Sequence, residues 1–295
     1  TVSILTWCIK CSKWFILVSV KEQVLNSPFC RTEFLDLAEI VSEEKITKYN
    51  NYAISKSSIV NVGNRNFVDY RPDIFIEPEV INDNNITNIN LDSLHFFQIQ
   101  NLVEKIDFKT IQIKKSDIAV NLILPRTYDE YLDGLTKKNR HELRRKKRKF
   151  DNENIQYKLE ESKELDIFDI FISQHKTSKG DKGRFMTDLV ETYFRNLLNL
   201  EGWKIYYINS KKGPLSIAFC YENKNGCYLY NSSRNKEFDY MNPGIILYDL
   251  IIQKLIEREM NFFDFLKGTE RYKYDLGGDS VQLYDLSMEL WIFYK

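Results

Sequence analysis

The segment "FLKGTERYKYDLGG", residues 265–278, carries the side chains best suited to chemistry. Lys267 and Lys273 are flexible cations that can neutralise a phosphate or a developing negative charge. Glu270, or Asp264 in the apolar run before the segment, is a candidate general base. The glycines of the segment serve a turn or the close approach of a ligand equally well. A plain connection needs only a short polar turn, so this composition predicts a site.

A second candidate site is the start of the apolar segment "NPGIILYDLIIQKLIE". Asn242 is a plausible helix N-cap, and Pro243 suits the first helical position. Free backbone N–H groups and the helix dipole stabilise an anion at such a start, and phosphate is a natural occupant. Asn242, Pro243, Gly244 and Ile245 are therefore candidate anion-binding residues. The same residues also fit an ordinary capped helix that packs on a sheet.

A third candidate is a very basic helix. Residues 137–149 hold nine Lys or Arg and one acid, Glu142. Arg140 and Arg144 lie one helical turn apart on one face and can offer forked donors to phosphate or carboxylate. A solvated helix face and a contact to a nucleic-acid backbone remain as alternatives. The total charge is balanced, with 42 basic and 42 acidic residues, so no global field attracts nucleic acid or anionic membranes.

The cysteines and the apolar N-terminal stretch predict a cytoplasmic protein. The five cysteines are odd in number and sparse, unlike a secreted disulfide scaffold. Cys8 and Cys11 form one C-x-x-C without a second pair, so we expect no metal. The apolar run at residues 4–20 is interrupted by Lys10 and Lys13 and is too short to span a membrane. We expect it to enter the core as a strand or helix.

The apolar patterns predict an α/β (α+β) chain whose mixed, mostly antiparallel sheets are flanked by helices. No linker separates an N-terminal part, residues 1–125, from a C-terminal part, residues 126–295, so the two should pack together. Strands are expected at 57–63, 73–78, 109–115, 119–125, 203–210, 215–222, 227–233, 261–267 and 281–295. Helices are expected at 91–106, 128–150, 163–178, 186–201 and 243–260, with a surface loop at 79–92.

Seven motifs in this order resemble a known family. The chain is similar to the acetyltransferase-like domain of the CelD-like cellulose-biosynthesis proteins, a branch of the GNAT (Gcn5-related N-acetyltransferase) fold related to the Fem-type aminoacyltransferases. The resemblance covers roughly residues 28–274. The motifs are "SPFCRTEFL", "VGNRNFVDYRPDIFI", "LTKKNRHELRRKKRKF", "HKTSKGDKGRF", "LSIAFCY", "NPGIILYDLIIQKLIE" and "FDFLKGTERYK".

The resemblance implies two GNAT-like halves, residues 1–125 and 126–295, with the acyl donor and the acceptor in a groove between them. It places the pyrophosphate of acyl-coenzyme A at the helix start formed by Asn242, Pro243, Gly244 and Ile245, although the family's usual Gln/Arg-x-x-Gly-x-Gly/Ala loop is absent. In the Fem-type relatives the lysine of a Phe/Tyr-Lys pair belongs to the active site. The resemblance therefore implies catalytic roles for Lys273, Glu270 and Asp264. The substrate-binding residues that it implies are Arg140, Arg144, Lys179, Arg184, Lys267 and Tyr272.

The function implied is transfer of an acyl group, an acetyl group above all, from acyl-coenzyme A to an amine or hydroxyl. The acceptor would be a sugar, a polysaccharide precursor or a peptide-like molecule. One alternative is a Fem-type transferase that uses aminoacyl-tRNA, with the basic helix as the RNA contact. Another is a non-catalytic GNAT-like module that assists polysaccharide assembly by binding a partner.

Overall fold

The computed structural model describes residues 21–42, 46–178 and 180–291. The apolar run at 4–20, Cys8, Cys11 and Lys179 lie outside these ranges. The described strands are β1 (Thr47–Tyr49), β2 (Tyr52–Ser55), β3 (Ser58–Asn61), β4 (Asn88–Leu94), β5 (Phe108–Ile123), β6 (Tyr157–Ser162), β7 (Trp203–Ser210), β8 (Ser216–Glu222), β9 (Gly226–Arg234), β10 (Phe262–Lys267) and β11 (Asp279–Leu290).

The described helices cover both faces of the strands. They are α2 (Thr32–Ala38), α3 (Pro78–Asp83), α4 (Phe96–Val103), α5 (Tyr128–Gly134), α6 (Lys137–Asp151), α7 (Leu165–Lys176), α8 (Asp181–Phe185), α9 (Asp188–Asn199), α10 (Pro243–Glu257) and α11 (Arg271–Asp275). Short 3-10 turns lie at η1 (Pro28–Cys30), η2 (Glu39–Val41) and η3 (Lys236–Met241). None of the helices in the described ranges is long and apolar enough to cross a membrane.

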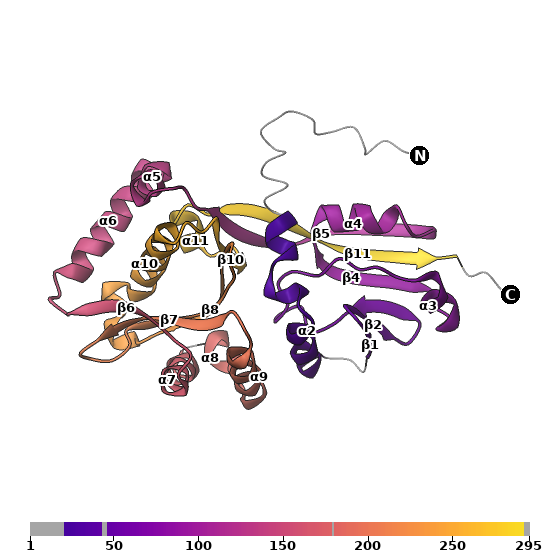
Figure 1. The fold of residues 1–295 in the computed structure, drawn as a ribbon, viewed down its shortest axis with the longest axis horizontal. Coiled ribbons are helices and arrows are strands. Elements are labelled where there is room, and N and C mark those ends of the chain that lie inside the picture. The colour runs from indigo at the N-terminus through magenta and orange to yellow at the C-terminus, as the bar shows by residue number, and fades with distance from the viewer. Residues whose placement is uncertain (1–20, 43–45, 179, 292–295) are drawn as a thin grey trace.

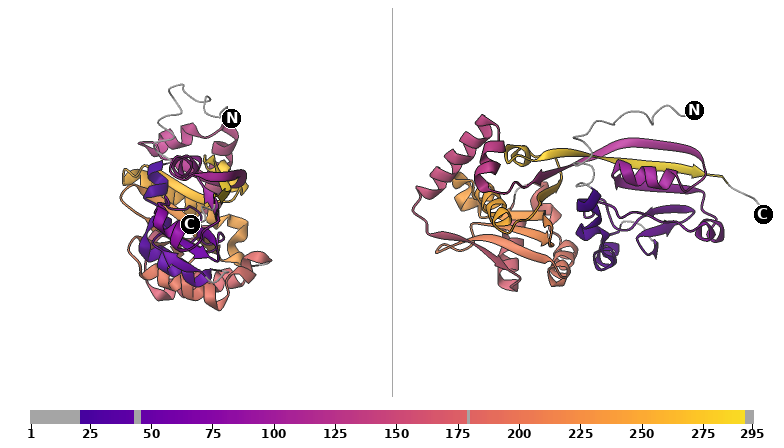
Figure 2. Two further views of the ribbon diagram at one scale, coloured as in Figure 1. Left: turned by 90° about the vertical axis from the view of Figure 1, so that its right-hand side faces the viewer. Right: turned by 45° about the horizontal axis from the view of Figure 1, so that its top comes forward.

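One sheet joins all the described strands, in the order β1-β2-β3-β4-β11-β5-β10-β9-β8-β7-β6. Only the β3–β4 and β9–β10 pairs are parallel among these strands. The expected mixed, mostly antiparallel sheet with helices on its faces is therefore confirmed. The last strand, β11, pairs with β4 on one side and with β5 on the other. Figure 2 shows β5 and β11 running side by side from the middle of the molecule to the end that holds β4.

Two helical layers enclose the C-terminal strands. In Figure 1, α5, α6, α10 and α11 lie on one face of β6–β10, and α7 and α9 lie on the other. Helix α10 buries residues on several faces, including Leu247, Asp249 and Ile252, as expected for a helix covered on more than one side. Helix α6 buries only Leu143 and Phe150, and most of its basic residues are exposed, whereas Lys147 is half-buried and lies 3.3 Å from the buried Asp249.

Aromatic packing joins the region of β1–β4 to the C-terminal layers. Phe34 of α2 stacks on Trp203 of β7 with ring centroids 6.0 Å apart. Tyr230 of β9 donates a hydrogen bond to the carbonyl oxygen of Phe67 at 2.7 Å. The two parts are therefore packed against each other, whereas the boundary at residue 125 stays a prediction.

The C-terminal elements were predicted well, and the differences lie mostly before residue 150. The expected strand at 73–78 is wrong: the segment pairs with no strand, and the Asp73 carbonyl accepts from the Asn51 side chain instead. The expected loop at 79–92 is wrong as well, since it contains α3 and most of β4. The strands expected at 109–115 and 119–125 are one long strand, β5. The helix expected at 128–150 breaks before Thr136, whose hydroxyl caps α6 by accepting from the Asn139 N–H at 3.2 Å.

Candidate active site

The candidate active site is a cleft that lies where the parallel strands β9 and β10 separate. The β9–β10 pairing ends at Tyr228 and Asp264. Beyond that pair, residues 229–232 and Arg234 of β9, residues 265–267 of β10 and Gly268 after it line a cleft of about 1040 Å³. Tyr230 is an extra residue in β9, because Cys220 pairs with Leu229 while Phe219 pairs with Asn231. A bulge leaves its extra residue outside the ladder, so this backbone is open to a ligand in the cleft.

Asp264 stabilises the bend at which β10 separates from β9. Its carboxylate accepts the Leu266 backbone N–H at 2.8 Å and the Tyr70 hydroxyl at 2.8 Å. Leu266 adopts a left-handed φ of 59°, which is costly for a leucine, so this hydrogen bond stabilises the bend. Asp264 is fully buried, and this burial raises the pKa of its carboxyl to about 7. Asp264 therefore shapes the cleft from beneath.

The pKa of Asp264 predicts how stability changes with pH. The unfolded state releases this proton near pH 3.8 and the folded state near pH 7, so the folded state binds more protons between these values. The free energy of unfolding should therefore fall as the pH rises through this window, by about 1 kcal/mol per pH unit from this group. Asp264→Asn, which resembles the protonated acid, should flatten that slope in urea titrations at pH 5 to 8. An unchanged slope would contradict the assignment.

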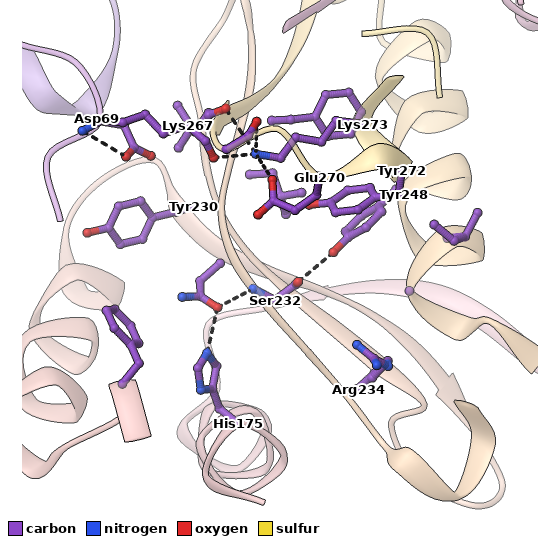
Figure 3. A pocket seen from close by; sticks show the side chains of 18 of the residues that line it. Asp69, His175, Tyr230, Ser232, Arg234, Tyr248, Lys267, Glu270, Tyr272 and Lys273 are labelled. Carbon is purple, nitrogen blue, oxygen red and sulfur yellow. Dashed lines mark hydrogen bonds and ion pairs between the residues drawn. The ribbon is translucent and has the colours of Figure 1, made fainter. Parts of the chain in front are cut away.

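Lys267 joins β10 to the N-terminal part of the chain across the cleft. Its Nζ donates to the Arg65 carbonyl at 2.8 Å and to the Ser93 hydroxyl at 2.9 Å. The same nitrogen lies 3.5 Å from Asp117 and 4.0 Å from Asp69. Burial lowers the pKa of Lys267, whereas these carboxylates raise it. Figure 3 shows Lys267 reaching towards Asp69 at one end of the cleft.

Lys273 is turned back into the loop. Although it lines the cleft, it is only 2% exposed. Its Nζ donates to the carbonyl oxygens of Leu266, Lys267 and Gly268 at 3.3, 2.5 and 3.3 Å and lies 3.0 Å from a Glu270 carboxylate oxygen. The lysine thereby satisfies the carbonyls at the end of β10 and holds the loop in place, as Figure 3 shows.

The start of α10 lies at the other end of the cleft. Asn242, Gly244 and Ile245 line it, and Pro243 is buried behind them. Asn242 is the N-cap residue and Pro243 begins the helix, as expected, but Asn242 is left-handed, with φ of 57°, and makes no side-chain capping bond. Its carbonyl instead accepts the Ile245 N–H at 3.1 Å. Since Pro243 has no N–H, Gly244 supplies the first backbone donor at the cleft.

The cleft brings together most, not all, of the predicted site residues. Lys267, Glu270, Tyr272 and Lys273 line it, and Tyr272 stacks on Tyr248 with centroids 5.2 Å apart. Other predicted residues lie elsewhere. Arg140 pairs with Asp133 at 2.7 Å, Arg144 is exposed on α6, Arg184 is exposed on α8, and Lys179 is outside the described ranges. None of these side chains lines the cleft in the described structure, so their role in substrate binding stays a prediction.

The residues that line the cleft opposite β10 were not predicted from the sequence. Asp69 and Asp117 line the cleft from the N-terminal part of the chain, and His175 and Asn231 line it from α7 and β9. A ring nitrogen of His175 lies 3.0 Å from the Asn231 side-chain oxygen. Asp69 lies within "VGNRNFVDYRPDIFI", one of the seven motifs of the resemblance. The spacing of this motif does not indicate that Asp69 lies near Lys267.

The part of the chain that forms most of this cleft resembles a known protein family. Residues 137–274 match the family model of the acetyltransferase (GNAT) domain. The matched region contains β9, β10, α10 and the loop with Lys273, so the splayed strands lie within the residues that resemble this domain. A comparison with curated proteins gives no match.

Solved structures of similar fold cover most of the chain. A conserved protein of unknown function from Bacteroides thetaiotaomicron matches with a TM-score of 0.57 at 11% identity, covering 92% of this chain and 96% of its own. The C-terminal domain of a putative lysylphosphatidylglycerol synthetase from Agrobacterium fabrum gives 0.53 at 12% identity, with 87% and 91% covered. FemX gives 0.51 at 10% identity, with 81% and 82% covered. At these identities the likeness shows the fold alone.

Proposed function

We propose that this protein is an acyltransferase that moves an acyl group, an acetyl group above all, from acyl-coenzyme A to an amine or hydroxyl. The observation that carries the proposal is the cleft between the splayed strands β9 and β10, which has the α10 start at one end and Asp69 with Lys267 at the other. The proposal includes membership of the CelD-like branch and an acceptor that is a sugar, a polysaccharide precursor or a peptide-like molecule. The order of the seven motifs supports that part.

The residues at the α10 end can bind the phosphates of the donor, but with fewer backbone N–H groups than a glycine-rich loop provides. The dipole of α10 favours an anion at its start, and the Gly244 N–H is available beside it. Arg234 lines this end too, although its guanidinium is paired with Asp239 at 2.5 Å. The donor would therefore be held by fewer backbone donors than a glycine-rich phosphate loop provides.

The open backbone around Tyr230 is suited to the reacting carbonyl. Backbone N–H groups aimed at a developing oxyanion stabilise the transition state of acyl transfer. The acceptor attacks the thioester carbon directly, so no nucleophilic Ser or Cys is needed. In this arrangement Lys273 and Glu270 line the cleft, and Asp264 holds the bend of β10 beneath it.

Calorimetric titration with acetyl-coenzyme A and with desulfo-coenzyme A tests the donor. We expect saturable binding of both, because the phosphates are common to them, and weaker binding by Lys273→Ala, which loosens the loop beside the cleft. Circular dichroism of each variant controls for folding. If the intact, folded protein binds neither compound, the acyl-coenzyme A proposal fails.

A second candidate is transfer from aminoacyl-tRNA. The basic helix α6 presents exposed Lys137, Lys138, Arg144, Arg148 and Lys149, which can contact a phosphate backbone. FemX and the putative lysylphosphatidylglycerol synthetase domain share the fold. This function predicts tRNA binding that weakens steeply with salt, and salt-independent or absent binding would exclude it. A partner-binding module without donor affinity is the remaining alternative.

A further inference from the structure

A second pocket, here called the basic pocket, lies between α6 and α11, outside the cleft described above. It has a volume of about 890 Å³, and its basic lining residues are Lys137, Lys138, His141 and Lys146 of α6 and Arg271 of α11. We propose that the basic pocket binds the terminal phosphoryl group of a small organic phosphate or of a phospholipid headgroup. This site is separate from the donor site proposed at the start of α10, and the inference does not depend on acyl transfer.

The walls of the basic pocket are held in place by hydrogen bonds within the protein. Asn139 of α6 donates from its side chain to the carbonyl oxygen of Tyr274 in α11 at 3.3 Å. Tyr131 of α5 donates from its hydroxyl to the carbonyl oxygen of Leu276, directly after α11, at 3.1 Å. The two walls are therefore positioned before any ligand binds, and a preformed site loses less conformational entropy on binding.

The short helix α11 stands between the basic pocket and the cleft. Arg271 and Asp275 line the basic pocket, whereas Tyr272 and Lys273 line the cleft. A ligand in the basic pocket therefore contacts a different side of α11 from a ligand in the cleft. The two sites can be occupied at the same time.

The charges around the basic pocket do not balance. Together, α6 and α11 hold eleven Lys or Arg and three carboxylates. Three carboxylates from outside these helices, Asp133, Asp249 and Glu270, pair with their cations. Positive charge remains in excess after these pairs are counted, although the whole chain is neutral. The excess is therefore local, and it favours an anionic ligand.

Two lysines of the basic pocket have no ion pair among the described residues. Lys137 and Lys138 are exposed in the first turn of α6, and this turn contains no acidic residue. Positive side chains at this end of a helix are disfavoured by the helix dipole and by each other. An anion bound beside both lysines would offset that cost.

The two carboxylates that line the basic pocket, Glu142 and Asp275, leave its cations able to bind a ligand. Both oxygens of Glu142 accept hydrogen bonds from Arg145 at 2.8 Å, which lower the pKa of Glu142 to about 2. Asp275 pairs with Arg271 at 3.4 Å, but the Arg271 side chain is 77% exposed. Exposed pairs of this kind contribute little. The Arg271 guanidinium can therefore turn to a phosphoryl group and donate two parallel hydrogen bonds to it.

A phosphoryl group suits the basic pocket better than a carboxylate or a nucleic-acid backbone does. A phosphate monoester carries nearly two negative charges at neutral pH, whereas a carboxylate carries one. A nucleic-acid backbone would use cations along the whole of α6, but Arg144, Arg148 and Lys149 do not line the basic pocket in the described structure. The volume of the basic pocket also lies within the range of small-molecule sites, about 300–1,000 Å³.

Titrations with phosphates and with vesicles test the site and identify the source of the phosphoryl group. Inorganic phosphate, glycerol 3-phosphate and glucose 6-phosphate would be titrated by calorimetry, with glycerol and glucose as controls. Phosphatidylcholine vesicles with and without phosphatidic acid would be tested by flotation. Saturable binding of a soluble phosphate supports a small-molecule ligand, and binding of the phosphatidic acid vesicles alone supports a lipid headgroup. Binding of neither kind of probe overturns the inference.

Lys138→Ala and Arg271→Ala each remove one cation, from opposite walls of the basic pocket. Each should weaken binding of the phosphate probe about tenfold, the usual contribution of one charge-assisted hydrogen bond. Lys224→Ala, in the exposed turn between β8 and β9, removes the same charge elsewhere and should leave the affinity unchanged. Circular dichroism checks that each variant is folded. Equal affinities in all three variants would refute the role of the basic pocket.

Gly244→Asp distinguishes the basic pocket from the proposed donor site. Gly244 lines the cleft and not the basic pocket, so this variant should bind the phosphate probe as the wild type does. Loss of phosphate binding in Gly244→Asp but not in Arg271→Ala would place the phosphate at the start of α10 and overturn the inference. Binding of tRNA without binding of any phosphate or vesicle probe would overturn it in favour of a nucleic-acid contact.

Discussion

Lys273→Met is expected to lower the free energy of unfolding by about 3 kcal/mol and to abolish turnover. Methionine fills a similar volume but donates no hydrogen bond, so the carbonyl groups of Leu266, Lys267 and Gly268 lose their shared donor. Each buried acceptor left unsatisfied costs about 1–3 kcal/mol. Lys267 would lose its position, because its own backbone is one of the groups that Lys273 holds. Urea unfolding and thiol-release assays measure the two effects.

Glu270→Gln is the matched variant for this prediction. It removes the ion pair with Lys273 but leaves the three carbonyl contacts intact. Because the Glu270 side chain is more than half exposed, its loss should cost less than about 1 kcal/mol. If Glu270→Gln destabilises the protein as much as Lys273→Met, the ion pair rather than the carbonyl contacts holds the loop. If Lys273→Met is as stable as the wild type, the structural role of Lys273 is wrong.

Gly244→Asp is expected to weaken binding of acetyl-coenzyme A about tenfold or more while leaving the fold intact. A carboxylate in the first turn of α10 would repel the phosphates of the donor. The same charge suits the positive end of the helix dipole and should stabilise the free protein by about 0.5 kcal/mol. Loss of affinity together with an unchanged or raised melting temperature is therefore the specific result. Calorimetry and thermal unfolding on the same samples measure both.

Gly244→Ala shows whether the lower donor affinity expected for Gly244→Asp comes from the charge of the new side chain or from its size. A Cβ at this position meets only the Ser216 hydroxyl at 3.9 Å, which is an ordinary contact. Alanine should therefore bind the donor with nearly the wild-type affinity. If alanine weakens binding as much as aspartate does, the site is limited by space rather than by charge. If aspartate leaves the affinity unchanged, the phosphates do not lie at the start of α10.

The C-terminal elements could be predicted because their signals are local. The turns "KKGP" and "NKNG" mark the hairpins between β7, β8 and β9, and α10 begins with Pro-Gly at its first turn. The loop that holds Lys273 follows β10 within a few residues, so its motif could be read from one short stretch. Gly277, one of the glycines that suit a turn, has φ of 89°.

The missed features depend on partners far away in the sequence. Asp69 meets Lys267 only because the chain brings together residues nearly 200 positions apart, and neither segment has a pattern that names the other. The bulge at Tyr230 and the bend at Leu266, which open the cleft, could not be predicted either, since both residues stand within ordinary strand patterns. The short strands β1 and β2 have too few residues to show a clear alternation.

The place of β11 has a consequence for the order in which the protein can fold. This strand is the last described element, yet it fills the gap in the sheet between β4 and β5. During synthesis, the first 125 residues therefore leave the ribosome with two strand edges unpaired until about 165 further residues have been made. Pairing over so long a separation is slow. A nascent or C-terminally truncated chain would thus expose these edges, and co-expressed holding chaperones should raise its yield more than they raise that of the full-length chain.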